Sequence, residues 1–96
     1  MRMMAMISMP AAAGNRAVKD GTIGKLMQQT QERWNPEAMY FAAPDGQRTA
    51  YIIFDMPDSS GLPSFAEPFF AALDADVQVV PVMNGEDLQK GLAQLR

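Results

Sequence analysis

Three side chains that can transfer a proton lie among apolar residues, and they are the candidates for catalysis: Tyr51, Asp55 and Glu67. Tyr51 and Asp55 alternate along one face of an expected strand, where a carboxylate on a half-buried sheet can act as a general base. The pattern favours a plainer interpretation, in which Asp55 is exposed at the strand end or paired with a cation. Glu67 either faces a cavity or places its charge early in a helix, and the second, structural role is favoured.

Arg16 and Lys19 are candidates for binding an anionic ligand. If a helix begins as early as Asn15, they lie seven and four residues before Ile23 and share its buried stripe. Charge in that position needs a partner, and a small carboxylic acid would supply one. If the helix instead begins near Thr22, both cations lie in a solvated loop, and this second interpretation is the favoured one.

Aromatic side chains and a further arginine complete the set of candidate ligand-binding residues. Trp34, Tyr40 and Tyr51 can stack on an aromatic ligand or hydrogen-bond to it, although aromatics at strand or helix spacing usually belong to a core. Arg48 is a candidate for the same ligand, or a cationic partner for Asp55.

The composition excludes several classes of protein. The chain has 96 residues with no cysteine and no histidine, which excludes disulfide frameworks, thiol nucleophiles, catalytic triads and nearly every structural zinc site. We therefore expect neither a metal nor a cofactor. Eleven acidic against eight basic residues give a net charge of −3, which argues against nucleic acid and acidic membranes as partners. With 48% hydrophobic and 20% charged residues, we expect one folded domain over residues 1–96.

The beginning of the chain resembles a short secretory signal, because one cation is followed by an apolar run and a small-residue site. Ser8 lies inside that run and Pro10 ends it, and these features favour a first strand instead. No segment approaches the ~20 apolar residues that a membrane span needs. We therefore expect a cytoplasmic protein that does not bind membranes.

Periodicity divides the chain into strands and helices. Strands are expected at residues 2–9, 37–43, 48–56 and 76–83, and helices at residues 15–34, 63–73 and 84–95. This order, β-α-β-β-α-β with a short C-terminal helix, predicts an α+β, ferredoxin-like sandwich with a four-stranded antiparallel sheet.

Turn and breaker residues support the same division. Small residues at 11–14 indicate a loop, and Pro-Asp-Gly-Gln at 44–47 predicts a hairpin between the second and third strands. Pro68 should kink its helix or split it in two. Asn84, with Asp87 three residues later, predicts a capped start for the last helix.

The expected strands are apolar on both faces, which a sheet covered on one side alone should not be. In the third strand, Ile52 and Phe54 lie on one face while Tyr51 and Ile53 lie on the other. Two helices can cover one face, and the remaining chain is too short to cover the second. Because monomers rarely expose a large apolar patch, we expect a homodimer formed through the second face. The less favoured alternative folds the C-terminal helix over that face.

Several segments resemble those of a known superfamily. The Pro-Glu-Ala-Met-Tyr-Phe strand at 36–41, Gly-Gln-Arg at 46–48, Glu-Pro at 67–68 and Pro-Val-Met at 81–83 resemble small bacterial proteins of the dimeric α+β barrel superfamily. Within it, the chain is similar to a group of this length that has no assigned activity. Characterised members include muconolactone isomerases, cofactor-free monooxygenases, haem-degrading enzymes and chlorite dismutases, and many bind a ligand between sheet and helices. The resemblance implies a homodimer with a ligand site, but it carries over no catalytic residue.

The residues leave two functions open. The first is a homodimer that binds a small, partly apolar organic acid or aromatic compound between helix and sheet, and that catalyses an isomerisation or a cofactor-free oxygenation. The second is a non-catalytic dimeric module, either a ligand sensor or an accessory interaction protein. A cavity lined by Lys19, Tyr40, Tyr51 or Glu67 would favour the first function, and a solid core with these groups in solvent would favour the second.

Overall fold

A computed structural model describes residues 1–95 of the chain. The helices and strands follow in the order β1 (Arg2–Ser8), α1 (Ala11–Lys19), α2 (Thr22–Trp34), β2 (Ala38–Ala42), β3 (Thr49–Asp55), α3 (Leu62–Leu73), β4 (Asp76–Pro81) and α4 (Gly85–Ala93). Single turns of 3-10 helix, η1 (Pro44–Gly46) and η2 (Ser59–Gly61), lie before and after β3.

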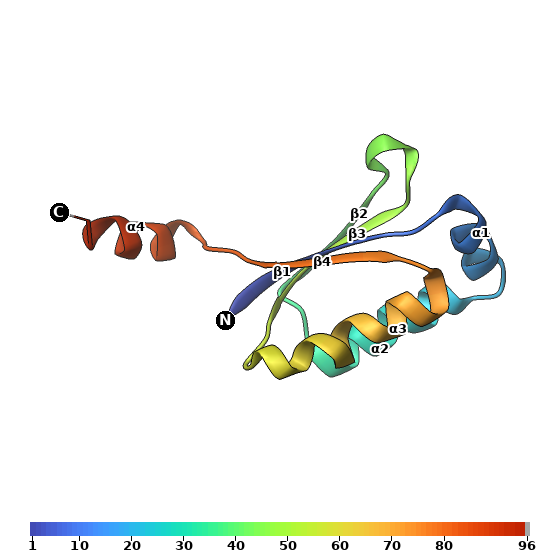
Figure 1. The fold of residues 1–96 in the computed structure, drawn as a ribbon, viewed down its shortest axis with the longest axis horizontal. Coiled ribbons are helices and arrows are strands. Elements are labelled where there is room, and N and C mark those ends of the chain that lie inside the picture. Colours follow the sequence, from blue (N-terminus) through green and yellow to red (C-terminus); the bar gives the residue numbers. More distant parts are fainter. Residues whose placement is uncertain (96) are drawn as a thin grey trace.

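The strands form one four-stranded antiparallel sheet in the order β2-β3-β1-β4. Helices α2 and α3 lie together against one face of this sheet, and α1 lies at one end of it (Figure 1). The predicted α+β class and four-stranded antiparallel sheet are confirmed, and the arrangement is compatible with a ferredoxin-like fold. The two strands at the centre, β3 and β1, carry the most buried residues of the sheet.

Two helices, α1 and α2, occupy the segment in which the sequence predicted a loop at 11–14 and one helix at 15–34. The loop expected at 11–14 is wrong, because these small residues form the start of α1 directly after Pro10. Alanine has the highest helix propensity, and the small side chains of Ala13 and Ala17 let α1 pack closely and become buried. The chain then breaks at Gly21, whose left-handed backbone (φ 82°) ends one helix and starts the next.

Helix α3 is one continuous helix although Pro68 lies inside it, so the predicted split is wrong. Pro68 removes the hydrogen bond that would run to the carbonyl of Ser64. Pro68 lies on the exposed side of α3, where water can satisfy that carbonyl. Phe65 and Phe69 hold the helix to the sheet on both sides of the missing bond, because both are fully buried.

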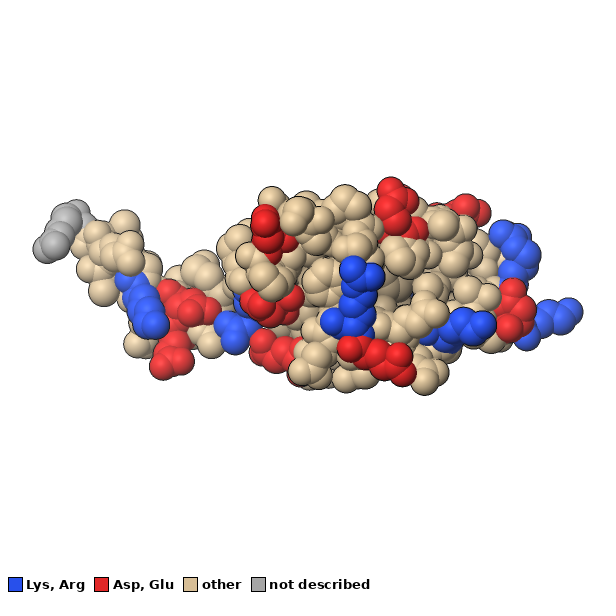
Figure 2. Space-filling model, turned by 90° about the horizontal axis from the view of Figure 1, so that it is seen from below, with Lys and Arg blue, Asp and Glu red and all other residues tan. Residues whose placement is uncertain are grey.

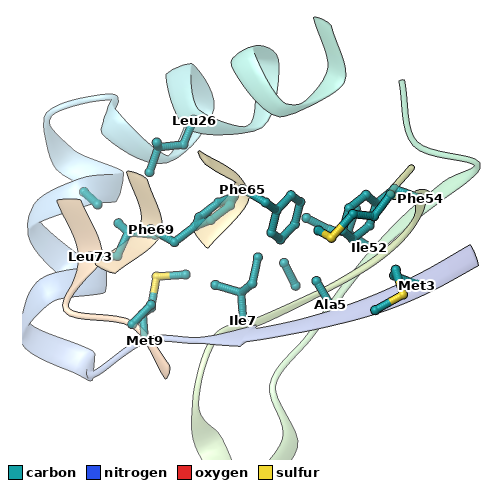
Figure 3. Packing of buried hydrophobic residues seen from close by; sticks show 14 residues of the cluster. Met3, Ala5, Ile7, Met9, Leu26, Ile52, Phe54, Phe65, Phe69 and Leu73 are labelled. Atoms are coloured by element: carbon teal, nitrogen blue, oxygen red, sulfur yellow. The ribbon is translucent and has the colours of Figure 1, made fainter. Parts of the chain in front are cut away.

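The space between the sheet and its helices is filled by side chains (Figure 3). The largest fully buried residues are Ile7, Ile52, Phe54, Phe65, Phe69 and Leu73. The rings of Phe54 and Phe65 stack with their centroids 4.3 Å apart and an interplanar angle of 7°. Trp34 meets both rings edge-on, each at 5.5 Å. This aromatic cluster joins the end of α2 to β3 and α3.

Helix α4 lies away from the sheet, at the end of an extended connection that follows β4 (Figure 1). It begins at the predicted capping box, in which Asn84 accepts from the Asp87 amide and Asp87 accepts from the Asn84 amide. Every residue of α4 except Asp87 is exposed. The alternative in which this helix covers the second face of its own sheet is therefore wrong for this chain.

Candidate functional site

The face of the sheet opposite to α2 and α3, called here the open face, carries a band of apolar side chains. Its central residues are Met4, Met6, Ala38, Tyr40, Tyr51, Ile53, Gln78 and Val80. The strand register sets them in two rows across the sheet, so that Met4 lies between Ile53 and Val80. In the next row, Met6 lies between Tyr51 and Gln78. Five of these eight side chains have no hydrogen-bonding atom and two more are tyrosines, as the double-sided pattern of the strands predicted.

The surface on the helix side is different in character. Acidic and basic side chains are scattered over it between uncharged residues, and no large area carries one sign (Figure 2). Such a mixed, charged surface is typical of a face in contact with water. The two sides of the molecule therefore differ: the helix side suits solvent, and the open face suits another apolar surface.

The three candidate catalytic residues do not come together. Tyr51 lies on the open face, whereas Glu67 is exposed on α3, which covers the opposite face of the sheet. Asp55 lies at the end of β3, where its Oδ1 is 2.7 Å from the Met1 amino nitrogen and the side chain is exposed. The predicted pairing of Asp55 with a cation is confirmed, but the cation is the Met1 amino group and not Arg48. Within one protomer these groups cannot serve one reacting molecule as acid and base.

Arg16 and Lys19 do not lie beneath a helix. The break at Gly21 places both on α1, where they are exposed. The guanidinium of Arg16 makes a long ion pair, 4.0 Å, with the exposed carboxylate of Asp74. An anionic ligand buried between helix and sheet would find neither cation, because the early helix start that would bury them does not occur.

Arg48 connects the start of β3 to α1. Its Nη2 donates to the side-chain oxygen of Asn15 at 3.0 Å, and the Met9 amide donates to its carbonyl at 3.2 Å. The guanidinium lies over Gly14, where an added Cβ would come within 2.7 Å of Nη1. These contacts give Arg48 a structural role in holding α1 to the sheet.

Trp34 lines a groove between α2 and α3, called here the helix groove, with a volume of about 400 Å³. Its walls are Leu26, Gln29, Thr30, Glu32, Arg33, Trp34, Ser64, Phe65, Pro68 and Phe69. The floor is apolar and the rim is polar. The Arg33 guanidinium lies 5.7 Å from the centre of the Trp34 ring, within the range of a cation–π contact. Of the predicted ligand-binding residues, Trp34 alone lines this groove.

Arg2 organises a charged cluster that the sequence reasoning missed. Its Nε donates to Glu37 at 2.7 Å and its Nη1 donates to Asp87 at 3.0 Å. The hydrogen bond to Glu37 raises the pKa of Arg2 above its ordinary value. The cluster borders a surface hollow of about 650 Å³ whose apolar floor includes Phe54 and Val82. Arg2 lies on the same face of β1 as Met4 and Met6, because alternate residues of a strand share a face. No sequence signal places Asp87 beside it.

The described residues show neither a metal-binding cluster nor a membrane-spanning helix. Among residues 1–95, no three acidic side chains gather closely enough to hold a metal ion. No helix in this described part of the chain is long and apolar enough to cross a membrane.

The chain matches one protein family along its whole length. The family is described as a domain of unknown function, DUF3303, and its model matches residues 1–96. No curated protein was found to match the sequence.

Proposed function

The chain belongs to the DUF3303 family, and we propose that it functions as a homodimeric, non-catalytic module in which the open faces of two copies pack together. Two sheets stacked in this way would form a dimeric α+β barrel, with the helices on the outside. The observation that carries the proposal is the apolar band on the open face.

The energetics of the open face support this proposal. Monomers rarely leave contiguous apolar patches of more than about 300–600 Å² in water. Covering such a patch is worth about 25 cal/mol per Å² of apolar surface, which amounts to roughly 10 kcal/mol for 400 Å². Two sheets with apolar inner faces satisfy one another, because a twofold axis presents the same patch from both sides.

The arrangement of the candidate residues supports a binding module over an enzyme. The space between sheet and helices is solid, and the potential acid and base groups Tyr51, Asp55 and Glu67 lie on separate surfaces. Lys19 and Tyr40 are exposed to solvent. A solid core with these groups in solvent is the combination expected of an interaction module.

The helix groove supports a second candidate function, the binding of a small ligand. A volume of about 400 Å³ lies within the range of small-molecule sites. Its apolar floor and the indole ring of Trp34 suit an aromatic ring, and Arg33 at the rim suits a carboxylate. The ligand class that this geometry fits is a small aromatic carboxylic acid, held on the outside of the helix layer.

A pair of matched variants tests the dimer. Ile53→Glu places a charge in the middle of the open face, and Ala71→Glu places the same charge on an exposed position of α3. Because burying an unpaired carboxylate is costly, we expect Ile53→Glu to weaken the dimer by about a hundredfold or more. Ala71→Glu should leave it unchanged. Size-exclusion chromatography with light scattering measures both, and equal masses for the two variants would contradict the proposal.

A further inference from the structure

Helix α4, its connection to β4 and the two described residues after it, residues 82–95, form a projection called here the arm. Its apolar residues recur at one-turn spacing and are exposed: Leu88 (45%), Leu92 (54%) and, just beyond the helix, Leu95 (71%). The opposite side of α4 carries Glu86 and Lys90. An amphipathic helix of this kind presents an apolar stripe to a partner surface.

The body of the same chain does not supply that surface. Its ties to the arm include two polar contacts, from Arg2 Nη1 to Asp87 Oδ2 at 3.0 Å and from the Val82 amide to the Arg2 carbonyl at 3.1 Å. The leucine stripe lies beyond both of them. The arm also extends the chain, whose radius of gyration of 15.0 Å exceeds the ~12.5 Å of a compact domain of this length.

Length gives a second reason to expect a partner for α4. The helix has nine residues, and isolated helices of fewer than about 12–15 residues are marginal in water. The capping box stabilises its first turn by roughly 1 kcal/mol, which is too little to hold an isolated helix. Packing of the leucine stripe on another surface supplies what is missing.

A second copy of this chain carries a matching surface. The β2–β3 hairpin rises off the open face at the end of the sheet opposite to α4 (Figure 1). On β2, Tyr40 and Phe41 are 66% and 63% exposed. If two open faces pack about a twofold axis that runs across the strands, each arm comes beside the partner's hairpin. The contact is then made twice, because in a twofold interface each surface meets its complement on the other copy.

We propose that α4 is an exchanged arm, whose leucine stripe packs along the β2 edge of a second copy's sheet, where Tyr40 and Phe41 point to opposite faces of the strand and are both exposed. The inference rests on the proposed dimer. It assigns a role to α4 and to the β2–β3 hairpin, which lie at opposite ends of the molecule. It explains why large aromatic side chains are exposed on β2 and why a short amphipathic helix extends into solvent.

Disulfide trapping tests the pairing directly, because the chain has no cysteine of its own. Chains carrying Phe41→Cys and Leu92→Cys are mixed, allowed to exchange subunits, and oxidised. We expect the mixed 41–92 disulfide at a yield several times that of a control in which Phe70→Cys, on α3, replaces Phe41→Cys. Equal yields in the two mixtures would overturn the inference.

A second measurement distinguishes the contact made by the arm from the contact between the two open faces. Leu92→Lys changes the stripe, and Ala93→Lys adds the same side chain on the polar side of α4. We expect Leu92→Lys to raise the dimer dissociation constant at least tenfold, with Ala93→Lys near the unsubstituted value. If the unsubstituted chain is a monomer, the proposed function and the arm both fail. If it is a dimer and Leu92→Lys leaves its dissociation constant unchanged, only the arm fails.

Thermal unfolding of dilute, monomeric protein tests whether α4 instead packs on the sheet of its own chain. Because α4 does not pack on its own body, Leu92→Lys should leave the unfolding temperature of the monomer unchanged. A clear decrease would show that the helix folds back on its own sheet, and it would overturn the exchange.

Discussion

Met6 and Tyr51 lie directly opposite each other on β1 and β3, on the face of the sheet that α2 and α3 do not cover. Both are half-buried by their neighbours and remain in contact with solvent in a single chain. Directly opposed apolar and aromatic side chains stabilise a sheet when they are removed from water. This pair marks the centre of the surface that we assign to the second copy.

The methionines provide a chemical probe of that assignment. Met4 and Met6 lie on the open face, Met3 and Met9 are buried in the core, and Met1 is exposed. We predict that dilute peroxide oxidises Met4 and Met6 as slowly as Met3 in the dimer, because the partner sheet excludes the oxidant. Mass spectrometry of the peptides measures each rate.

The monomeric variant Ile53→Glu serves as the control for this experiment. In it, Met4 and Met6 should become reactive while Met3 and Met9 stay protected. Oxidation of Met4 and Met6 at the rate of Met1 in the unsubstituted chain, at concentrations where it should be dimeric, would contradict the covered face.

The aromatic cluster of the core predicts a large loss of stability on truncation. Phe65→Ala removes a fully buried ring that stacks on Phe54 and leaves a cavity. We expect a loss of about 3–5 kcal/mol in the free energy of unfolding. Phe70→Ala, on the exposed side of the same helix, should cost less than ~1 kcal/mol. Urea unfolding of both variants provides the comparison, and similar losses would be inconsistent with the packing in Figure 3.

The start of α2 predicts a pH dependence. The Thr22 amide donates to Asp20 Oδ1 at 2.9 Å. Hydrogen bonding from the Thr22 side chain, and then from this amide, lowers the pKa of Asp20 below its ordinary value of 3.8. The stabilisation is therefore full at pH values above about 4 and is lost as the pH falls through the lowered pKa.

Two variants at this position test the sign of the effect. Asp20→Ala should lower the melting temperature by a few degrees at pH 7 and have little effect near pH 2. Asp20→Asn keeps an oxygen acceptor that does not titrate. The difference in melting temperature between this variant and the unsubstituted chain should therefore change with pH in the acid range alone. A lower melting temperature of Asp20→Ala that persists unchanged into acid would show that the ionised carboxylate does not stabilise the start of α2.

The helix groove predicts a fluorescence response, because Trp34 is the single tryptophan of the chain. We expect small aromatic carboxylic acids to change the emission of Trp34 in a saturable manner. Arg33→Gln should weaken this binding about tenfold, whereas Lys25→Gln, on the same helix but away from the groove, should not. If both variants bind equally, or no acid binds, the second candidate function is wrong.

Period-two and helical spacing were sufficient to predict the sheet. The apolar residues on both sides of β3, such as Ile52 and Ile53, also predicted that the sheet has two apolar faces. The hairpin and the capped start of α4 followed from Pro44-Asp45-Gly46 and from Asn84, because these signals depend on neighbouring residues. Contacts between residues that are far apart in the sequence were harder to predict.

The errors came from residues whose local preference allows two outcomes. Pro10 can precede a loop or stand at the start of a helix, and in the structure the alanines after it form α1, with Ala13 and Ala17 buried. The Arg2 cluster joins residues that are 35 and 85 positions apart, and no local pattern encodes such pairs. The direction in which α4 extends from the sheet depends on contacts with other surfaces, and the spacing of residues along one sequence does not predict those contacts.

Sedimentation equilibrium of the unsubstituted chain tests the central claim most directly. Over low micromolar concentrations, the account predicts a mass twice the 10.5 kDa of one chain, falling toward one chain on dilution. A mass of 10.5 kDa that stays constant up to several hundred micromolar would contradict it, because the apolar band would then remain in water without a partner.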